Sequence, residues 1–238
     1  MTSMRRKLLT VIDKTDSRLG ELGLTRRASF DDFKGRSLKA LYAGRLSRHL
    51  PQWSTDYIGM TPFFPSSRNI GHDATKPLPL PDDYLDLYQS EDVFEHIEYD
   101  KLFAVFDEIH RVLKPGGTFR LSLPDYGFDG YSTRTKRDAD GAFQFDPGGG
   151  GGFENGKVVD GGHLWFPTYD LVKALFDRSA FARKGTVDFL HYTAPDGTFV
   201  MKPIDFRIGY VQRVPGNDNR VADRPRPISI VVDARKDG

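Results

Sequence analysis

Apolar residues near the middle of the chain follow the period of a strand, then of a helix, then of a strand again. Residues 84–88 form an apolar-rich run after the turn signal at 81–83, which predicts a strand. From residue 100 apolar side chains recur every three or four positions, which predicts an amphipathic helix. Pro115 and two glycines end that helix and lead into a strand at 118–123. The right-handed crossover of such a βαβ unit implies a parallel sheet with helices on its faces.

Similar patterns predict further elements on both sides of this unit. An N-terminal helix or helix pair is expected within residues 5–24, packed on the sheet, and Thr168 is a credible N-cap for a helix that reaches Phe176. Further strands are expected at 38–43, 55–60, 68–72, 187–192, 206–211 and 228–232.

Residues 127–162 differ from the rest of the chain because they are rich in glycine, aspartate and aromatic residues. Five consecutive glycines at 148–152 follow no strand and precede no helix, so they do not predict a phosphate-binding loop. We expect a long, structureless insert. Because it leaves the carboxyl end of a parallel strand, we interpret it as a lid over a ligand site.

Composition narrows the class of protein. The chain has 238 residues, which is enough for one α/β domain with its own core. Its 34 basic and 33 acidic residues give no overall field that would recruit nucleic acid or an anionic membrane. The chain has no cysteine, which excludes disulfides and thiolate metal sites. No apolar run is long enough to span a bilayer, so a cytoplasmic protein without membrane insertion is expected.

The run from residue 73 to 126 resembles the middle of a class I S-adenosylmethionine-dependent methyltransferase of the type 11-like kind. The shared signals are an acidic residue after the third strand, the turn "PLPLPDD", "EHI" after the fourth strand and "RVLKPGG" before the fifth. The resemblance continues more faintly through 163–181 and 228–236. It implies a single domain over 1–238, with a helical leader at 1–36 and the lid-like insert at 127–162. The implied fold is α/β: a doubly wound, Rossmann-like seven-strand sheet whose last strand is antiparallel.

The resemblance also implies S-adenosyl-L-methionine as cofactor and suggests which residues contact it. Gly44 matches the first glycine of the family's loop after the first strand, but Arg45 and Leu46 replace its small residues. Asp56 stands near the position of the ribose-binding acid, although a strand at 57–60 would put Gly59 there instead. The other implied contacts are Asp73, either as an adenine contact or as a turn residue, with its neighbour Ala74, and Ser90, Glu91 and Asp92 at the mouth of the fourth strand.

Proton removal from an acceptor hydroxyl would suit a histidine, and three residues are candidates for the catalytic site. His163 is the first choice of base, with Asp125 beside it, and His96 either acts as the base or caps a helix. The six histidines show no metal-ligand spacing, so no metal site is expected.

The function favoured is methylation, at oxygen, of a small-molecule or glycan-like acceptor, with a homodimer as a possible assembly. The degenerate loop at 44–46 leaves a second interpretation open, a non-catalytic methyltransferase-like protein or partner subunit. A nucleotide-binding oxidoreductase is disfavoured because no Gly-x-Gly-x-x-Gly follows the first strand.

Overall fold

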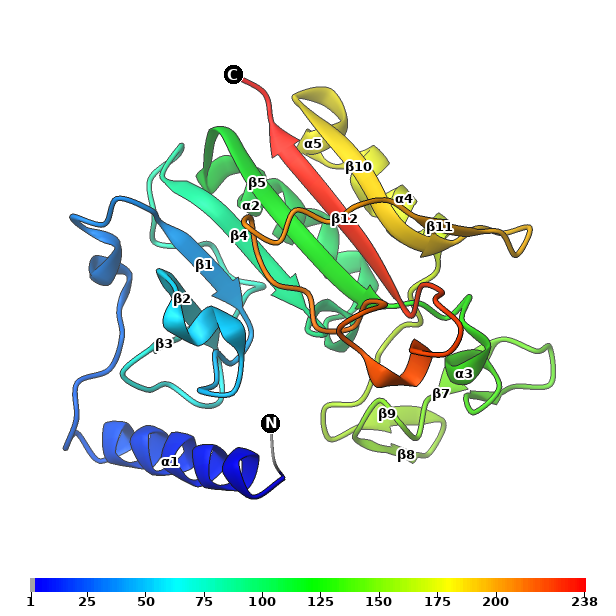
Figure 1. Ribbon diagram of the computed structural model, residues 1–238, viewed down its shortest axis with the longest axis horizontal. Coiled ribbons are helices and arrows are strands. Elements are labelled where there is room, and N and C mark those ends of the chain that lie inside the picture. The colour runs from blue at the N-terminus through cyan, green and yellow to red at the C-terminus, as the bar shows by residue number, and fades with distance from the viewer. Residues whose placement is uncertain (1–2) are drawn as a thin grey trace.

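One eight-stranded sheet runs through the computed structural model, which describes residues 3–238 (Figure 1). Its strands lie in the order β11-β10-β12-β5-β4-β1-β2-β3. The five strands from β1 to β5 are parallel, and β12 is inserted antiparallel to both β5 and β10. Their bounds are β1 Ala40–Ala43, β2 Tyr57–Thr61, β3 Asn69–Gly71, β4 Leu85–Glu91, β5 Leu113–Pro124, β10 Gly185–Thr193, β11 Phe199–Met201 and β12 Ser229–Lys236.

The sheet confirms the predicted fold class and differs from it in detail. The short edge strand β11 is an eighth strand that the sequence did not predict. Residues 206–211, all of them described, form no strand, so that expectation was wrong. β5 begins directly after α2 (Leu102–Val112), and the reversal expected at the glycines occurs within the strand, at Gly116 with φ +79°.

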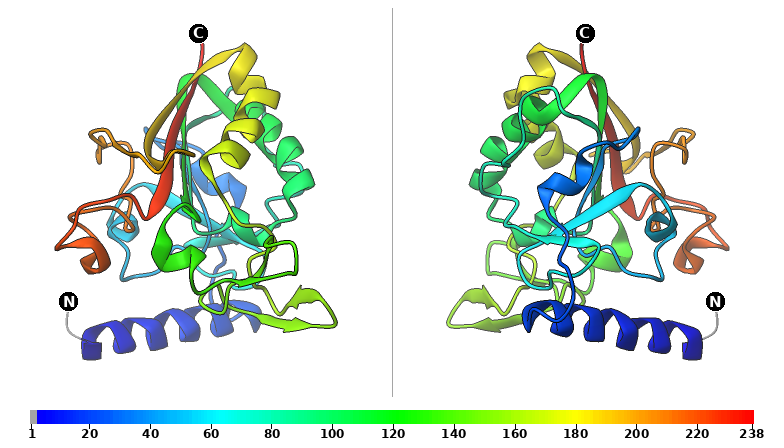
Figure 2. Two further views of the ribbon diagram at one scale, coloured as in Figure 1. Left: turned by 90° about the vertical axis from the view of Figure 1, so that its right-hand side faces the viewer. Right: turned by 90° about the vertical axis from the view of Figure 1, so that its left-hand side faces the viewer.

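Three helices, α2, α4 (Tyr169–Arg178) and α5 (Ala180–Arg183), cover one face of the sheet (Figure 2). The periodic apolar side chains of α2 are buried with Phe119, Leu121 and Leu123 of β5 in the main core. The buried α2 residues are Leu102, Val105, Phe106, Ile109 and Val112. Each fully buried side chain of this size contributes about 1.5–3 kcal/mol, so this face holds the sheet and its helices together.

The opposite face carries no α-helix in the part of the chain that the structure describes. The β2–β3 connection, residues 62–68, is too short for a crossover helix, which takes a dozen residues or more. Residues 202–228, between β11 and β12, lie over this face instead (Figure 2). We call them the covering segment.

A buried arginine ties the covering segment to the sheet. The side chain of Arg120 on β5 is 1% exposed, and its Nε and Nη2 donate to the two carboxylate oxygens of Asp233 on β12 at 2.7 and 2.6 Å. Its Nη1 donates to the carbonyls of Asp205 and Gly209 in the covering segment at 2.8 and 2.6 Å. Every charge-bearing nitrogen therefore has an acceptor, which a buried guanidinium requires.

The N-terminal helix α1 (Ser3–Glu21) lies beside the carboxyl ends of the strands and not on a sheet face, so the expected packing was wrong (Figure 1). Its Asp13 accepts a hydrogen bond from the backbone N–H of Arg48, and its Asp16 accepts one from the hydroxyl of Ser67. Among the described residues, no helix combines the length and apolar composition that crossing a bilayer requires.

The insert at 127–162 is ordered, contrary to the expectation of a structureless loop. It contains α3 (Asp129–Ser132), the ribbon β6 (Lys136–Arg137) with β7 (Phe143–Phe145), and the ribbon β8 (Gly152–Glu154) with β9 (Lys157–Val159). Aromatic packing among Tyr126, Tyr131 and Phe143 supports it. In the glycine run, a Cβ on Gly149 would lie 2.7 Å from the ring of His163, so close packing is the reason for that glycine. The role as a lid stays a prediction.

Replacing Arg120 by Met should destabilise the protein by about 3–5 kcal/mol, because Asp233 would keep a partly buried carboxylate without its partner. The measurement is urea unfolding followed by circular dichroism. Arg207→Ala is the control, since it removes an exposed arginine of the same covering segment and should leave stability unchanged. Equal stability of Arg120→Met and the native chain would show that the guanidinium does not hold the segment.

Candidate active site

The carboxyl ends of β1, β4 and β5 meet at one edge of the sheet, where ligands bind in open α/β folds. Gly44 follows β1 with φ +129°, a backbone conformation that favours glycine. A Cβ at this position would lie 3.0 Å from a methyl carbon of Val93 and 3.1 Å from the ring of Tyr42. Close packing of Val93 and Tyr42, together with the positive φ, is therefore the reason for a glycine at this position.

The rest of the β1 loop is held by protein contacts. The N–H of Gly44 donates to the carbonyl of Met60 at 2.8 Å. Leu46 is fully buried, and its N–H and carbonyl are both paired with the side-chain amide of Asn69, at 2.7 and 3.0 Å. Leu46 thus replaces a small residue because it fills the space between this loop and β2.

The mouth of β4 carries three polar residues, and the covering segment reaches two of them. Glu91 is buried and accepts hydrogen bonds from the N–H groups of Gln212 and Arg213 at 2.7 and 3.2 Å. Asp92, with φ +52°, forms an ion pair of 2.7 Å with the guanidinium of Arg213. The second oxygen of Asp92 and the hydroxyl of Ser90 are buried without a hydrogen-bond partner. Burial raises the pKa of Glu91 to about 8, with the Asp92 charge adding to it, and burial also raises the pKa of Asp92.

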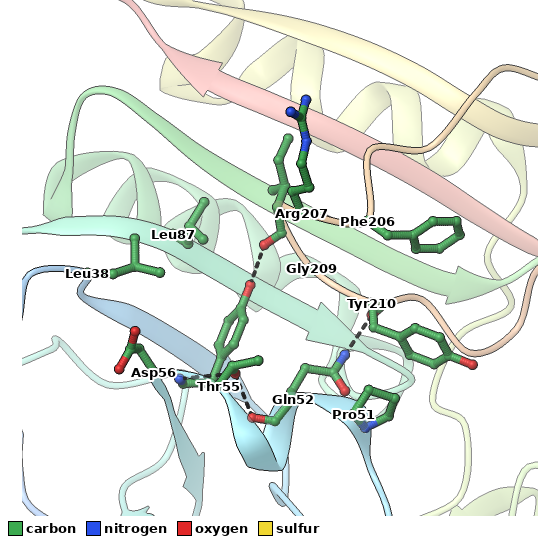
Figure 3. Close-up of a pocket in the computed structure, with 12 residues that line it drawn as sticks. Leu38, Pro51, Gln52, Thr55, Asp56, Leu87, Phe206, Arg207, Gly209 and Tyr210 are labelled. Carbon is green, nitrogen blue, oxygen red and sulfur yellow. Dashed lines mark hydrogen bonds between the residues drawn. The ribbon is translucent and has the colours of Figure 1, made fainter.

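Asp56 lies at the wrong edge for the ribose contact expected of it. It precedes β2, so it sits at the amino end of that strand, whereas Gly44 lies at the carboxyl end of the parallel neighbour β1. It lines a pocket of about 490 Å³ between the start of β2 and residues 206–210 of the covering segment (Figure 3). The hydroxyl of Tyr57 and the side-chain amide of Gln52 cross this pocket to carbonyls of the covering segment. The sequence allowed a strand that begins at residue 55 or at residue 57, and the observed strand begins at Tyr57 and ends at Thr61.

Asp73 and Ala74 follow β3 at the same edge as Gly44. One oxygen of Asp73 accepts from both the N–H and the hydroxyl of Thr75 at 2.9 Å, and the backbone bond holds the pKa of Asp73 below its usual value. Ala74 packs against the main core. Asp73 therefore stabilises this turn through one carboxylate oxygen. Its second oxygen takes part in neither hydrogen bond to Thr75.

Two of the candidate catalytic residues lie together. The rings of His96 and His163 pack edge to face with centroids 4.8 Å apart. His163 Nδ1 is 2.6 Å from the hydroxyl of Tyr126, which donates to Asp146, and His96 Nδ1 is 3.1 Å from the carbonyl of Gly162. Burial and the neighbouring His96 lower the pKa of His163 to about 4, so its imidazole is neutral at pH 7.

Asp125 does not join this pair. Its two oxygens accept from the N–H groups of Gly127 at 2.8 Å and Thr193 at 2.7 Å, and the side chain is fully buried. It holds the start of the insert against β10. Both carboxylate oxygens thus bind backbone N–H groups, which favours a structural role for Asp125.

Sequence reasoning missed Glu95, although "EHI" contains it. Glu95 and His96 lie in the 3₁₀ turn Phe94–His96 after β4, and one oxygen of Glu95 is 3.9 Å from His96 Nε2 and 3.7 Å from His163 Nε2. The carboxylate is fully buried, and neither oxygen has a hydrogen-bond partner. Burial, together with the charge of Asp92, raises its pKa well above the usual value. An acid next to a histidine in a turn was the only signal for it, and such pairs are usually exposed.

Residues 44–121 match the family model of a methyltransferase domain, about a third of the chain. The match begins at Gly44 and ends in β5, so it spans the strand ends described above. It agrees with the methyltransferase resemblance expected from the sequence over this part of the chain. No curated protein matches the sequence.

Several solved structures are similar in outline. A SAM-dependent methyltransferase from Archaeoglobus fulgidus is 16% identical with a TM-score of 0.46, and the match covers 93% of each chain. One from Mesorhizobium loti is 17% identical with a TM-score of 0.46, covering 84% of this chain and 91% of that one. Burkholderia thailandensis 1,6-didemethyltoxoflavin-N1-methyltransferase is 14% identical with a TM-score of 0.43, covering 98% and 84%. These values do not identify an activity for the present protein.

Glu91→Gln should make stability less dependent on pH. The folded protein holds the Glu91 proton up to about pH 8 and the unfolded chain only to about pH 4.5, so this contribution is complete at low pH and is lost as pH rises through 8. Glutamine keeps an acceptor for Gln212 without titrating. The variant should gain on the order of 2–4 kcal/mol relative to the native chain between pH 5 and 8. Unfolding measured at pH 5 and at pH 8 gives the stability of both chains. Glu98→Gln is the control, because it changes an exposed acid. The same difference in stability between Glu91→Gln and the native chain at pH 5 and at pH 8 would show that the pKa of Glu91 is not raised.

Proposed function

We propose that this chain is an S-adenosylmethionine-dependent methyltransferase that binds its cofactor at the carboxyl ends of β1 and β4. The observation that carries the proposal is the methyltransferase-domain match over 44–121, which begins at Gly44 and includes the mouth of β4, at the edge where β1 and β4 end side by side. When bound, the cofactor supplies the methyl group and its leaving group. The chain's own task is to position the acceptor and exclude water.

The residues at this edge fit such a ligand in three respects. Gly44 gives the loop at the carboxyl end of β1 a backbone with φ +129° and no side chain. The hydroxyl of Ser90 and one oxygen of Asp92 are buried without partners, and such atoms cost free energy unless a ligand pairs with them. Asp73 offers a second carboxylate oxygen at the end of β3. We propose Gly44, Asp73, Ser90 and Asp92 as the cofactor-binding residues. Three other residues expected there are not proposed: Asp56 lies at the opposite edge, Ala74 packs against the core, and the Glu91 carboxylate is taken by the covering segment.

A second candidate function, a non-catalytic methyltransferase-like protein, is favoured by one group of contacts. The N–H groups of Gly44 and Leu46 are already paired within the protein, and the covering segment occupies Glu91 with the N–H groups of Gln212 and Arg213. In this candidate the covering segment takes the place of a ligand.

Calorimetry with S-adenosylmethionine and S-adenosylhomocysteine separates the two candidates, because it needs no acceptor. We expect both to bind, and Asp73→Ala to weaken binding by about 1–3 kcal/mol through loss of a hydrogen bond. Asp196→Ala is the matched control, since Asp196 makes the same turn contact, to the N–H of Thr198, in the hairpin between β10 and β11. Failure of both ligands to bind the native chain would favour the non-catalytic candidate. Equal losses in the two variants would remove Asp73 from the site.

We propose that the acceptor is a small or glycan-like hydroxyl compound methylated at oxygen. The support is a pair of imidazoles at the carboxyl-end edge, beside an insert rich in aromatic residues. The side chain of His96 is 33% exposed and that of His163 is 7% exposed. His96 is therefore the base that an acceptor can reach, and His163 packs behind it.

His96→Ala should lower turnover by about 10²–10⁴-fold, the usual contribution of a general base, while cofactor affinity stays close to the native value. Transfer of labelled methyl groups to a panel of hydroxylated small molecules provides the assay. His163→Ala should also lower turnover, by less, because it acts through the position of His96. His110→Ala, which removes a histidine on the helical side of the sheet, is the control. If His96→Ala and His163→Ala both keep normal turnover, neither histidine acts as a base, and positioning of the acceptor is sufficient for the reaction.

A further inference from the structure

Three side chains that can bind a metal ion lie close together at the carboxyl-end edge of the sheet: Glu95, His96 and His163. Each offers one potential ligand atom, and these atoms all lie within 4.8 Å of one another. They come from two distant parts of the chain, the 3₁₀ turn after β4 and the end of the insert.

The hydrogen-bond partners of the two imidazoles define which nitrogen carries the proton. His96 Nδ1 faces the carbonyl of Gly162, which can only accept, so Nδ1 carries the hydrogen and Nε2 a lone pair. Arg134 forms two bonds of 2.7 Å with Asp146, and the Tyr126 hydroxyl donates to the same carboxylate. The Tyr126 oxygen is therefore the acceptor for His163 Nδ1–H, and His163 Nε2 also carries a lone pair.

Glu95 adds a third group of the same kind. Its oxygens have no hydrogen-bond partner, and the distances of 3.7 and 3.9 Å to the two Nε2 atoms are too long for hydrogen bonds. The buried carboxyl group of Glu95 and the two Nε2 atoms thus face each other without a hydrogen bond between them. Such a group costs free energy unless a proton or a cation neutralises it, and a cation at the centre would satisfy all three ligand atoms at once.

The dimensions suit one metal ion. Zinc lies about 2.0–2.1 Å from nitrogen and carboxylate ligands, so two ligands on a tetrahedral ion are about 3.4 Å apart. The two separations from Glu95 would shrink by about 0.3 and 0.5 Å on binding, and a separation at the cluster's limit of 4.8 Å would shrink by about 1.4 Å, which requires a rotation of an imidazole. Metal-bound histidines typically donate their other N–H to a carbonyl or to a carboxylate relay, and both histidines here do so.

We propose that Glu95, His96 and His163 bind one divalent first-row transition-metal ion, with zinc as the first candidate. Two imidazoles and a carboxylate are a ligand set of zinc and iron enzymes that leave further positions open. The open side is at His96, the most exposed of the three. The sequence predicted no metal site because the two histidines are 67 residues apart and only the fold brings them together. The ion would fasten the insert to the end of β4. Because it would occupy the lone pair of His96 Nε2, the role of His96 as a base proposed above belongs to the metal-free protein.

The test is zinc titration of chelator-treated protein by calorimetry, with the metal content of the untreated protein measured by mass spectrometry. We expect one equivalent to bind, and Co²⁺ in its place to give a visible spectrum typical of nitrogen and oxygen ligands. Tyr126→Phe removes a residue that supports a ligand without binding the ion itself, and such changes usually lower metal affinity by about 10–100-fold. Glu95→Gln removes a ligand, so we expect it to lower zinc affinity by more than that. His72→Ala and Glu98→Gln, outside the cluster, should bind zinc normally.

Stability of the metal-free variants provides a second readout. Glu95→Gln is isosteric and removes an unpaired buried carboxylate, so the metal-free variant should melt no lower than the metal-free native chain, and zinc should no longer raise its melting temperature. Native zinc affinity in Glu95→Gln, the absence of one-to-one binding, or a lower melting temperature in the metal-free variant would overturn the proposal. Cofactor calorimetry is independent of these results. A metal-loaded protein that fails to bind S-adenosylmethionine would reject the proposed function and keep the metal site.

Discussion

The buried guanidinium of Arg120 is the constraint on which the rest of this structure depends. A charge at the centre of a sheet face has to be neutralised and fully hydrogen-bonded, and here Asp233 and two carbonyls of the covering segment meet that requirement. The segment is thereby drawn over a face that carries no α-helix among the described residues. Its continuation then brings Arg213 to Asp92. The shape of the candidate site thus follows from one arginine in the middle of β5.

The helical side of the sheet could be predicted from sequence because its pattern is local. The apolar period of α2, the glycines after it and the strands on both sides required only neighbouring residues to recognise. The covering segment could not be predicted, since it is polar and aperiodic and is held by contacts more than 80 residues away in sequence. The order within the insert was missed for the same reason, because its aromatic residues stabilise it only once they are folded against Phe166.

The candidate site was predictable in part. Gly44 and the mouth of β4 were found because strand ends can be located from the apolar pattern. Asp56 was misplaced because its strand begins at the next residue, and this small difference moves a side chain from one edge of the sheet to the other. Glu95 was overlooked because nothing in a sequence shows that an acid is buried without a partner. That fact depends on His163, which lies 68 residues further along the chain.

The position of β12 in the sheet has a consequence for biosynthesis. This strand follows both β5 and β10 in the chain, yet it lies between them and pairs with both. Until it emerges, β10 has no place in the sheet, and Arg120 lacks its carboxylate partner. The nascent chain must therefore wait with an open sheet edge, a state in which strands can pair with other chains.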